Sequence, residues 1–420
     1  MAIKLKTTKP TKRDSVFLLY LNIFERLFFF FIFLLIARNF PADIYGNLIT
    51  LLTAASIIAY VLDMGLPVFF QREIASGIKD PNKLFSNIIL IVFVKFFVYS
   101  TIFFFIYIIF FKSINSGLFS VILVMVYLNS LAGLLNSALS GINHYKSQFI
   151  SSFIPRLLIL MIFIISIYVF HSNLFWLFTI LLAGTFLQNV LLFYNTVTSG
   201  LSFSFKELDF KLTTGILKTS IPLALAVIFN FLYDKIDVLI IASLKNYTEV
   251  GYYNVGYGIY KASNITFTFL LTAGLTRVSY LSKRPAAVKL FFWKYLKILF
   301  WISLIINILL LTGAEPIIEL LYTSKFQASI PVLQILSFSV FALAANNLTG
   351  TILNGTKNYR ANMYITLSGL IINIIMNLFL IPAYGIIGAV FATLITEYFI
   401  FFGDTVFIIK FCRKNIPYVK

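Results

Sequence analysis

Twelve long apolar runs, separated by short polar breaks, make up most of the 420 residues. A helix that crosses a bilayer needs about 20 mostly apolar residues, and each run has that length. The runs are 16–37, 44–70, 84–111, 116–142, 149–170, 174–195, 218–244, 252–276, 290–313, 330–353, 362–381 and 385–411. The pattern therefore predicts an all-α integral membrane protein with 12 transmembrane helices.

The longest break, 196–217, is the natural joint between two sets of six runs. It holds one short amphipathic segment, 203–212, and is too short for a globular domain. We therefore predict three parts: a six-helix bundle over 1–200, a cytoplasmic linker over 201–217, and a second six-helix bundle over 218–420.

The positions of the basic residues predict the orientation of the chain. With a cytoplasmic N-terminus, the inside segments hold 22 Lys and Arg, the outside loops four, and the runs the other seven of 33. This asymmetry follows the positive-inside rule and places both termini in the cytoplasm. It also explains the net charge of +18 without a nucleic-acid partner. With 60% hydrophobic and 11% charged residues, the composition excludes an ordinary soluble domain.

Three pairs of similar segments recur in the same order in the two halves. They are Asn22–Arg26 with Asn230–Lys235 at an offset of 208 or 209, Ile44–Asn47 with Gly251–Asn254, and Leu139–Lys146 with Leu353–Arg360 at 214. Six helices per half give parallel repeats about an axis along the membrane normal. We expect two pseudo-symmetric bundles around a central cavity, with the substrate site near the membrane midplane.

Charged residues deep inside the runs are costly in lipid, so they are the candidate functional residues. The deep bases, which we expect to bind an anionic substrate, are Arg26, Lys95, Lys235 and Lys261. The acids, which we expect to couple a cation or to form salt bridges, are Glu25, Asp234, Asp237 and Glu397. The alternative is a buried ion-pair network, such as Glu25 with Lys235, that only fixes helix packing.

Three further charges lie nearer the ends of their runs. We expect Arg156 to extend to the head groups, and Asp63 and Asp404 to pair with bases in the loops.

No motif of an enzyme occurs in the chain. There is no GxxxxGK[ST] loop, no GxSxG elbow and no cluster of His and Cys. We therefore predict no catalytic residue, no metal and no cofactor. A gradient of H⁺ or Na⁺, or of the substrate itself, would drive transport.

Several segments resemble the polysaccharide-unit flippases, the Wzx-type O-antigen transporters of the multidrug/oligosaccharidyl-lipid/polysaccharide exporter superfamily. The segments are Ala37–Gly46, Leu62–Leu66, Gln71–Ala75, Asp237–Ile241, Glu249–Asn254 and Asn377–Ala389. The resemblance implies two six-helix bundles around a V-shaped cavity. It also implies cation-coupled movement of an undecaprenyl-pyrophosphate-linked oligosaccharide across the bacterial inner membrane. Membrane lipid and a polysaccharide polymerase complex are the implied partners.

Three alternatives stand beside this interpretation. A multidrug extrusion antiporter would share the fold, but its cavity typically carries acids and aromatics for cationic drugs rather than four bases. A lipid II flippase usually has two further C-terminal helices. A membrane glycan polymerase or ligase would need a larger outside platform than the predicted outer loops provide.

Overall fold

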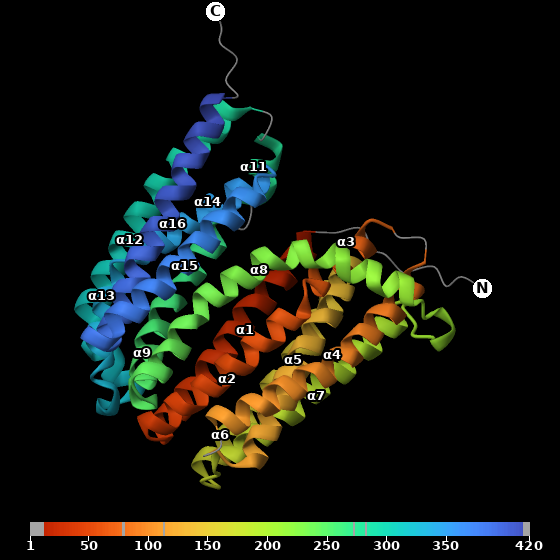
Figure 1. Cartoon of the computed structure of the whole chain (residues 1–420), viewed down its shortest axis with the longest axis horizontal. Helices are drawn as coiled ribbons and strands as arrows, with labels where there is room; N and C mark the ends of the chain where they lie inside the picture. The colour runs from red at the N-terminus through yellow and green to blue at the C-terminus, as the bar shows by residue number, and fades with distance from the viewer. Residues whose placement is uncertain (1–11, 78–79, 112–113, 272–273, 282–283, 415–420) are drawn as a thin grey trace, which may run out of the picture. The chain divides into compact units, whose positions relative to one another are not determined.

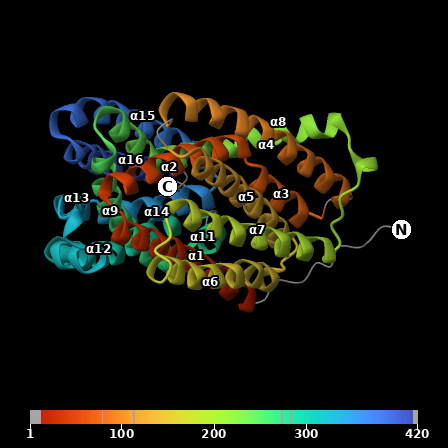
Figure 2. The ribbon, with the colours of Figure 1, turned by 90° about the horizontal axis from the view of Figure 1, so that it is seen from below.

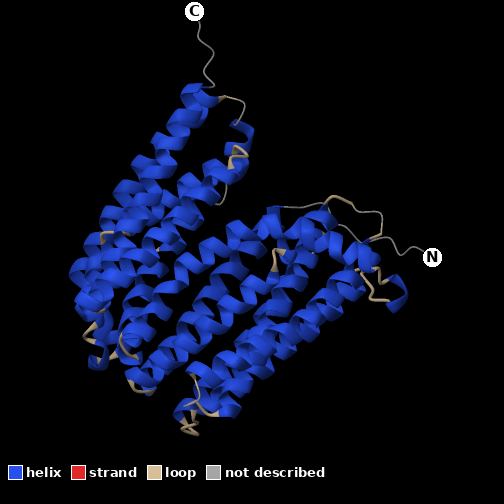
Figure 3. Cartoon of the chain, in the orientation of Figure 1, coloured by secondary structure: helices blue, strands red, loops and turns tan. Residues whose placement is uncertain are grey.

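The computed structural model describes residues 12–77, 80–111, 114–271, 274–281 and 284–414. Within these ranges all regular structure is helical, and Figure 3 shows no strand in them. Some of the bases counted for the orientation, among them Lys9, Lys79 and Lys283, lie outside the described residues. The prediction of an all-α chain is confirmed.

Packing divides the described helices into two compact units. The first unit comprises the described residues up to Leu35 together with Leu51–Ile228, and the second comprises Ile36–Thr50 together with Phe229 onward. Three helices, α1, α2 and α8, therefore contribute to both units. This division follows side-by-side packing, whereas the predicted boundaries near residues 200 and 217 separate transmembrane bundles from a linker. The predicted boundaries therefore stay a prediction.

The first unit is built from seven helices, a short 3-10 helix and the beginning of α8. They are α1 (Lys12–Asn39), α2 (Ala42–Asp63), α3 (Leu66–Ala75), α4 (Pro81–Phe110), α5 (Ser116–Gly141), α6 (Tyr145–Tyr168), α7 (Leu174–Thr198), η1 (Phe205–Glu207) and α8 (Phe210–Leu244). The helix α5 packs against α3 and α7, and α6 packs against α7 (Figure 1). Their shared core includes Phe70, Phe85, Leu135 and Leu139, all nearly inaccessible to solvent.

The second unit continues from α8 through the remaining helices. They are α9 (Tyr247–Ala262), α10 (Asn264–Leu271), α11 (Gly274–Leu281), α12 (Pro285–Tyr322), η2 (Ser324–Phe326), α13 (Ser329–Ser337), α14 (Val340–Gly355), α15 (Tyr359–Tyr384) and α16 (Ile386–Lys414). The helices α15 and α16 run side by side (Figure 1, Figure 2). The helix α13 connects two others, since it packs against both α9 and α12.

Each of the twelve predicted apolar runs is mostly helical in its described residues. Among the described residues, nine helices are long and apolar enough to cross a membrane, or ten if the bent pair α13 and α14 forms one span. The other two runs correspond to α8 and to the series α9, α10 and α11. In the apolar 18-residue stretch of α12 that could span the membrane, only 17% of the residues are buried inside the protein. Most of the apolar side chains of this helix therefore face outward. Such a surface is what a lipid-facing helix requires.

Three predicted runs are broken rather than continuous. The run 44–70 becomes α2 and α3, because Met64 and Gly65 both have positive φ. A Cβ on Gly65 would also lie 2.8 Å from the carbonyl oxygen of Ser220. This corner therefore requires glycine for two reasons, the positive φ and the close approach of Ser220. The run 330–353 bends by 52° between α13 and α14, where the Ser337 hydroxyl donates to the Gln334 carbonyl. The run 252–276 is interrupted at Ser263, between α9 and α10.

The linker contains little helix. Within the amphipathic segment 203–212 only η1 and the first residues of α8, which begins at Phe210, are helical. The buried side chain of Asn87 on α4 explains why: it donates to the Glu207 carbonyl and accepts from the Asp209 amide, at 2.9 and 2.8 Å. Lys83 adds an ion pair with Asp209 at 2.8 Å. These contacts hold the linker against α4 in an extended path.

The corners before α6 and before α15 have the same backbone turn. Asn143 and Lys357 both lie in the left-handed region, with φ of 62° and 63°. The next residue donates its amide to the carbonyl five residues back, His144 to Leu139 at 2.9 Å and Asn358 to Leu353 at 2.7 Å. These are the segments that the sequence paired at an offset of 214, and their hydrogen bonds follow the Schellman pattern.

Candidate substrate and ion site

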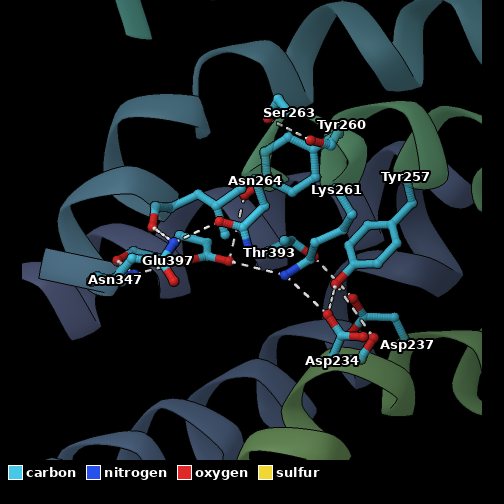
Figure 4. A network of polar contacts seen from close by, with 12 residues as sticks. Asp234, Asp237, Tyr257, Tyr260, Lys261, Ser263, Asn264, Asn347, Thr393 and Glu397 are labelled. Carbon is cyan, nitrogen blue, oxygen red and sulfur yellow. Dashed lines mark hydrogen bonds and ion pairs between the residues drawn. The ribbon is translucent and has the colours of Figure 1, made fainter. Parts of the chain in front are cut away.

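Four ionisable side chains of the second unit meet in one network, and Figure 4 labels three of them, Asp234, Lys261 and Glu397. Asp234 and Lys235 lie in the second half of α8, Lys261 near the end of α9, and Glu397 on α16. The ammonium of Lys261 lies 2.9 Å from Asp234 Oδ1 and 3.6 Å from Glu397 Oε1. The ammonium of Lys235 lies 2.9 Å from Asp234 Oδ2. Two cations therefore balance two carboxylates, which reduces the cost of placing them in an apolar unit.

Tyrosines of α9 line this network because they recur at helical spacing. The Tyr257 hydroxyl donates to Asp234 Oδ1 at 2.8 Å, and the Tyr260 hydroxyl donates to Glu397 at 3.4 Å. The Lys261 ammonium also lies 5.2 and 5.7 Å from the centres of the two rings. Both rings thus favour a charged Lys261 by cation–π attraction.

The carboxylates differ in their exposure. The side chain of Glu397 is only 3% exposed, and Asn346 donates to its Oε2 at 2.7 Å. The side chains of Asp234 and Lys235 are 31% and 36% exposed. The network therefore has a closed end at Glu397 and an open end at Lys235.

A second carboxylate, Asp237, lies one turn further along α8 and makes no ion pair with any described residue. It is buried and accepts three hydrogen bonds, from Tyr253 at 2.6 Å, from Thr393 at 2.9 Å and from Asn377 at 2.7 Å. The Asn377 amide also donates to the side-chain oxygen of Asn373 at 3.0 Å. The Asn377 side-chain oxygen and the Asn373 side-chain nitrogen have no hydrogen-bond partner. Two hydroxyl groups, on α9 and α16, and one amide nitrogen, on α15, thus donate to one buried carboxylate on α8.

The first unit holds two separate ion pairs. Arg156 on α6 lies 2.7 Å from Glu25 on α1, and its guanidinium lies 5.9 Å from the Phe29 ring. Lys95 on α4 pairs with Asp63 at the end of α2, and Ser130 on α5 bonds to both. The side chain of Arg26 is exposed and makes no ion pair with another described residue.

Five of the eight predicted site residues come together in the second unit: Asp234, Lys235, Asp237, Lys261 and Glu397. Glu25, Arg26 and Lys95 lie in the first unit. Glu25 pairs with Arg156 rather than with Lys235. Lys95 is buried and its ammonium is occupied, which leaves no open side for a substrate.

Three expectations about the remaining charges were wrong. Arg156 does not extend to the head groups but is buried beside Glu25. Asp63 pairs with Lys95 inside the unit and not with a loop base. Asp404 is buried and accepts from the Thr349 hydroxyl at 2.7 Å, without an ion pair to any described residue. In each case the partner is a side chain on another helix of the same unit.

The sequence did not identify the neutral members of the site. These are Tyr253, Tyr257, Asn346, Asn373, Asn377 and Thr393. A signal exists for some of them, because Asn373 and Asn377 lie four residues apart on one face of an apolar helix, as do Tyr253 and Tyr257.

Sequence comparisons relate the chain to proteins of glycan synthesis. The family model described as polysaccharide biosynthesis protein matches residues 11–279, and the model described as MatE matches residues 222–379. Uncharacterized membrane protein MJ1375 of Methanocaldococcus jannaschii is 30% identical over 275 residues, which are 61% of this chain and 63% of that protein. Uncharacterized membrane protein MJ1068 of the same archaeon is 36% identical over 102 residues, 24% of this chain and 19% of that protein. The chain thus spans less than two thirds of either relative.

Solved structures of transporters share the fold at low identity. Lipid II flippase MurJ in an inward closed conformation has a TM-score of 0.69 and 15% identity, covering 96% of this chain and 90% of that chain. A multidrug resistance MATE family transporter facing inward has a TM-score of 0.72 and 13% identity, covering 92% of this chain and 96% of that chain. A MOP superfamily transporter from Pyrococcus furiosus, reported with a binding pocket of reverse polarity, has a TM-score of 0.68 and 13% identity, covering 98% of this chain and 98% of that chain. These neighbours are transporters and a flippase, not enzymes, as the sequence predicted for this chain.

Proposed function

The chain belongs to the polysaccharide biosynthesis protein family, and on that premise we propose that it is a flippase for a lipid-linked oligosaccharide. Its substrate would be an O-antigen or capsule repeat unit on undecaprenyl pyrophosphate. The unit would move from the inner to the outer leaflet of the bacterial cytoplasmic membrane by cation-coupled alternating access. Support comes from the family match over 11–279 and from the fold shared with the flippase MurJ and with MATE transporters.

The observation that carries the proposal is the open end of the network at Lys235. This ammonium lies on an otherwise apolar stretch of α8, and its ion-pair partner is the adjacent Asp234. Asp234 is also bound by Lys261 through its other oxygen. Because Lys261 shares Asp234 with it, and because its side chain is 36% exposed, the Lys235 ammonium remains accessible to an anion, and a pyrophosphate is a strong acceptor for it. Lys235 is therefore our candidate phosphate contact, with Lys261 behind it.

The exposed Arg26 is the candidate phosphate contact of the first unit. Its neighbour Glu25 is already paired with Arg156, so Glu25 does not neutralise Arg26. We assign Lys95 to helix packing, because Asp63 and Ser130 occupy its ammonium.

The buried Asp237 is the candidate coupling site. A hard cation such as Na⁺ prefers oxygen ligands, and the Asp237 carboxylate and the Thr393 hydroxyl carry such oxygens. The side-chain oxygen of Asn377, which has no hydrogen-bond partner, is a third candidate ligand because the same amide contacts Asp237 through its nitrogen. A proton on the carboxylate would be the alternative cargo. Either cation would neutralise a buried acid that no described base balances, so its binding and release would alter the packing of α8 against α15 and α16.

We place the protein in the membrane with both termini in the cytoplasm, on the basis of the 22 to four distribution of basic residues. A unit delivered to the outer leaflet would then be available to a polysaccharide polymerase complex.

Charge reversal in the host cell tests this proposal. Lys235→Glu and Arg26→Glu should each abolish surface glycan while the protein remains in the membrane at its normal level. Lys294→Glu, which changes an exposed lysine on α12, is the matched control and should leave the glycan unchanged. Normal surface glycan in both charge-reversal variants would refute the proposed phosphate contacts.

A multidrug antiporter is the second candidate, favoured by the MatE match over 222–379. Its substrates would be cations drawn to Asp234 and Glu397. Export of a cationic dye that depends on these acids, together with normal glycan in cells lacking the protein, would favour it over the flippase.

A further inference from the structure

A pocket of about 500 Å³ opens at the corner between α14 and α15, away from the charged network of α8. Its lining includes Lys357, Tyr359, Arg360 and Tyr364, with Phe407 of α16. No acidic residue lines it. The side chains of Lys357 and Arg360 are exposed and make no hydrogen bond or ion pair with another described residue. The pocket therefore presents two free positive charges.

At the equivalent corner of the first half, side chains bond to one another. There the His144 ring nitrogen Nδ1 lies 2.9 Å from the Ser199 hydroxyl, and Tyr145 donates to the side chain of Asn143 at 3.1 Å. The turn itself is the same in both corners, with Asn143 matching Lys357 and Lys146 matching Arg360. Since the two corners share a backbone turn, the second base at the α14–α15 corner comes from its sequence, with Lys357 where the first corner has Asn143.

Lys357 is an unusual residue for its position. Its φ of 63° lies in the left-handed region, which asparagine adopts more readily than lysine. The first corner has asparagine there. A lysine held in this conformation at the mouth of a basic pocket suggests that its charge is used.

The surroundings of the pocket match the edge of a membrane. Tyr359 and Tyr364 are 56% and 61% exposed, and tyrosine concentrates at membrane interfaces. Beyond them, the exposed side chains of α15 and α16 are apolar, among them Ile371, Phe402 and Val406. The orientation proposed above puts the two bases on the cytoplasmic side. A molecule with an anionic head at the bases and an apolar tail along the two helices would fit this order.

We propose that this pocket binds the phosphate head group of an anionic membrane lipid, with the acyl chains lying along α15 and α16. Phosphate is the shared chemistry of a lipid head group and of free phosphate, and the apolar flank favours the lipid. This site is distinct from Lys235 and its network, so it does not depend on the flippase proposal.

Binding of short-chain lipids to the purified full-length protein tests the site by native mass spectrometry. The wild type should bind dioctanoyl phosphatidylglycerol more tightly than dioctanoyl phosphatidylcholine. The variant Lys357→Asn with Arg360→Gln should lose about 30-fold in phosphatidylglycerol affinity, as two interfacial charges at about 1 kcal/mol each imply. Asn suits the left-handed turn, so this variant should fold, and an unchanged melting temperature checks that.

Two controls make the result specific. The double variant Lys146→Gln with Lys206→Gln removes two exposed lysines of the first unit and should bind as the wild type does. Arg360→Lys, which keeps the charge, should retain most of the affinity. Equal phosphatidylglycerol affinity of the wild type and the Lys357→Asn/Arg360→Gln variant would overturn the proposal. Displacement of the lipid by millimolar inorganic phosphate would also overturn it, because the ligand would then be free phosphate.

Discussion

Replacing Lys261 by methionine should destabilise the second unit, because this ammonium is shared by two carboxylates. It lies 2.9 Å from Asp234 and 3.6 Å from Glu397, so with an effective dielectric of about 20 each gross attraction is about 5 kcal/mol. Desolvation offsets most of this. Losing one partner of a buried pair costs about 3–5 kcal/mol. The Lys261 side chain is 24% exposed, so water screens part of the loss, and we expect about 2 kcal/mol.

A double-mutant cycle separates this charge effect from lost packing. In Lys261→Met with Glu397→Gln the buried carboxylate is no longer unpaired, so the double variant should be about 1–2 kcal/mol more stable than the sum of the single effects predicts. The same cycle with Lys294→Met, an exposed lysine on α12, should show no coupling. The assay is equilibrium unfolding of the purified protein in mixed micelles. Strict additivity of Lys261→Met and Glu397→Gln would refute the shared-cation account.

Three further predictions concern other parts of the chain. If Na⁺ is the coupling ion, Asp237→Asn should abolish the stabilisation of the purified protein by Na⁺. If the proton is the coupling ion, the same variant should abolish the pH dependence of glycan transport. A variant that keeps both the Na⁺ stabilisation and the pH dependence would exclude Asp237 as the coupling site. Gly46→Ala should lower the free energy of unfolding by about 1–3 kcal/mol, because its Cβ would lie 1.7 Å from the Tyr247 carbonyl oxygen. Gly258→Ala is the control: its Cβ would meet open space, so it should not destabilise the protein in the same unfolding assay. The hydrogen bond from Lys83 lowers the pKa of Asp209 in the folded protein. The ionised Asp209 therefore stabilises the folded state at pH values above the ordinary aspartate pKa of about 3.9, and this stabilisation is lost as the pH falls through the lowered pKa of the folded protein. Acid unfolding should therefore depend less steeply on pH below 4 in Asp209→Asn than in the wild type, and identical profiles would contradict the linker contact.

The hydrophobic pattern predicted the helices because lipid-spanning segments must be long, apolar and helical. It predicted the breaks poorly: Gly65 marks a corner only because of its tight packing on Ser220, which involves residues more than 150 positions apart. The same limit applies to 330–353, where the bend depends on one hydroxyl bonding within its own turn.

The charged site residues were predictable for a physical reason. A carboxylate or ammonium in an apolar run is costly, so Asp234, Lys235 and Lys261 were conspicuous in the sequence. Their partners were not, because pairing is decided by which helices pack together. Lys261 meets Glu397 from 136 positions away, and Glu25 meets Arg156 from 131. Neutral ligands such as Thr393 carry no such cost and so no such signal.

Transport by the purified protein in vesicles tests the central claim most directly. The probe is a fluorescent oligosaccharide on a short-chain polyprenyl pyrophosphate, and membrane-impermeant dithionite reports the fraction in the outer leaflet. We predict that the wild-type protein exchanges the probe between leaflets. Lys235→Gln should slow this exchange at least about tenfold, because it loses one charge-assisted hydrogen bond of about 1.5–3 kcal/mol. Lys294→Gln should not slow the exchange. Equal exchange by the wild type and Lys235→Gln, or no exchange of this probe by a wild-type protein that extrudes a cationic dye, would contradict the account.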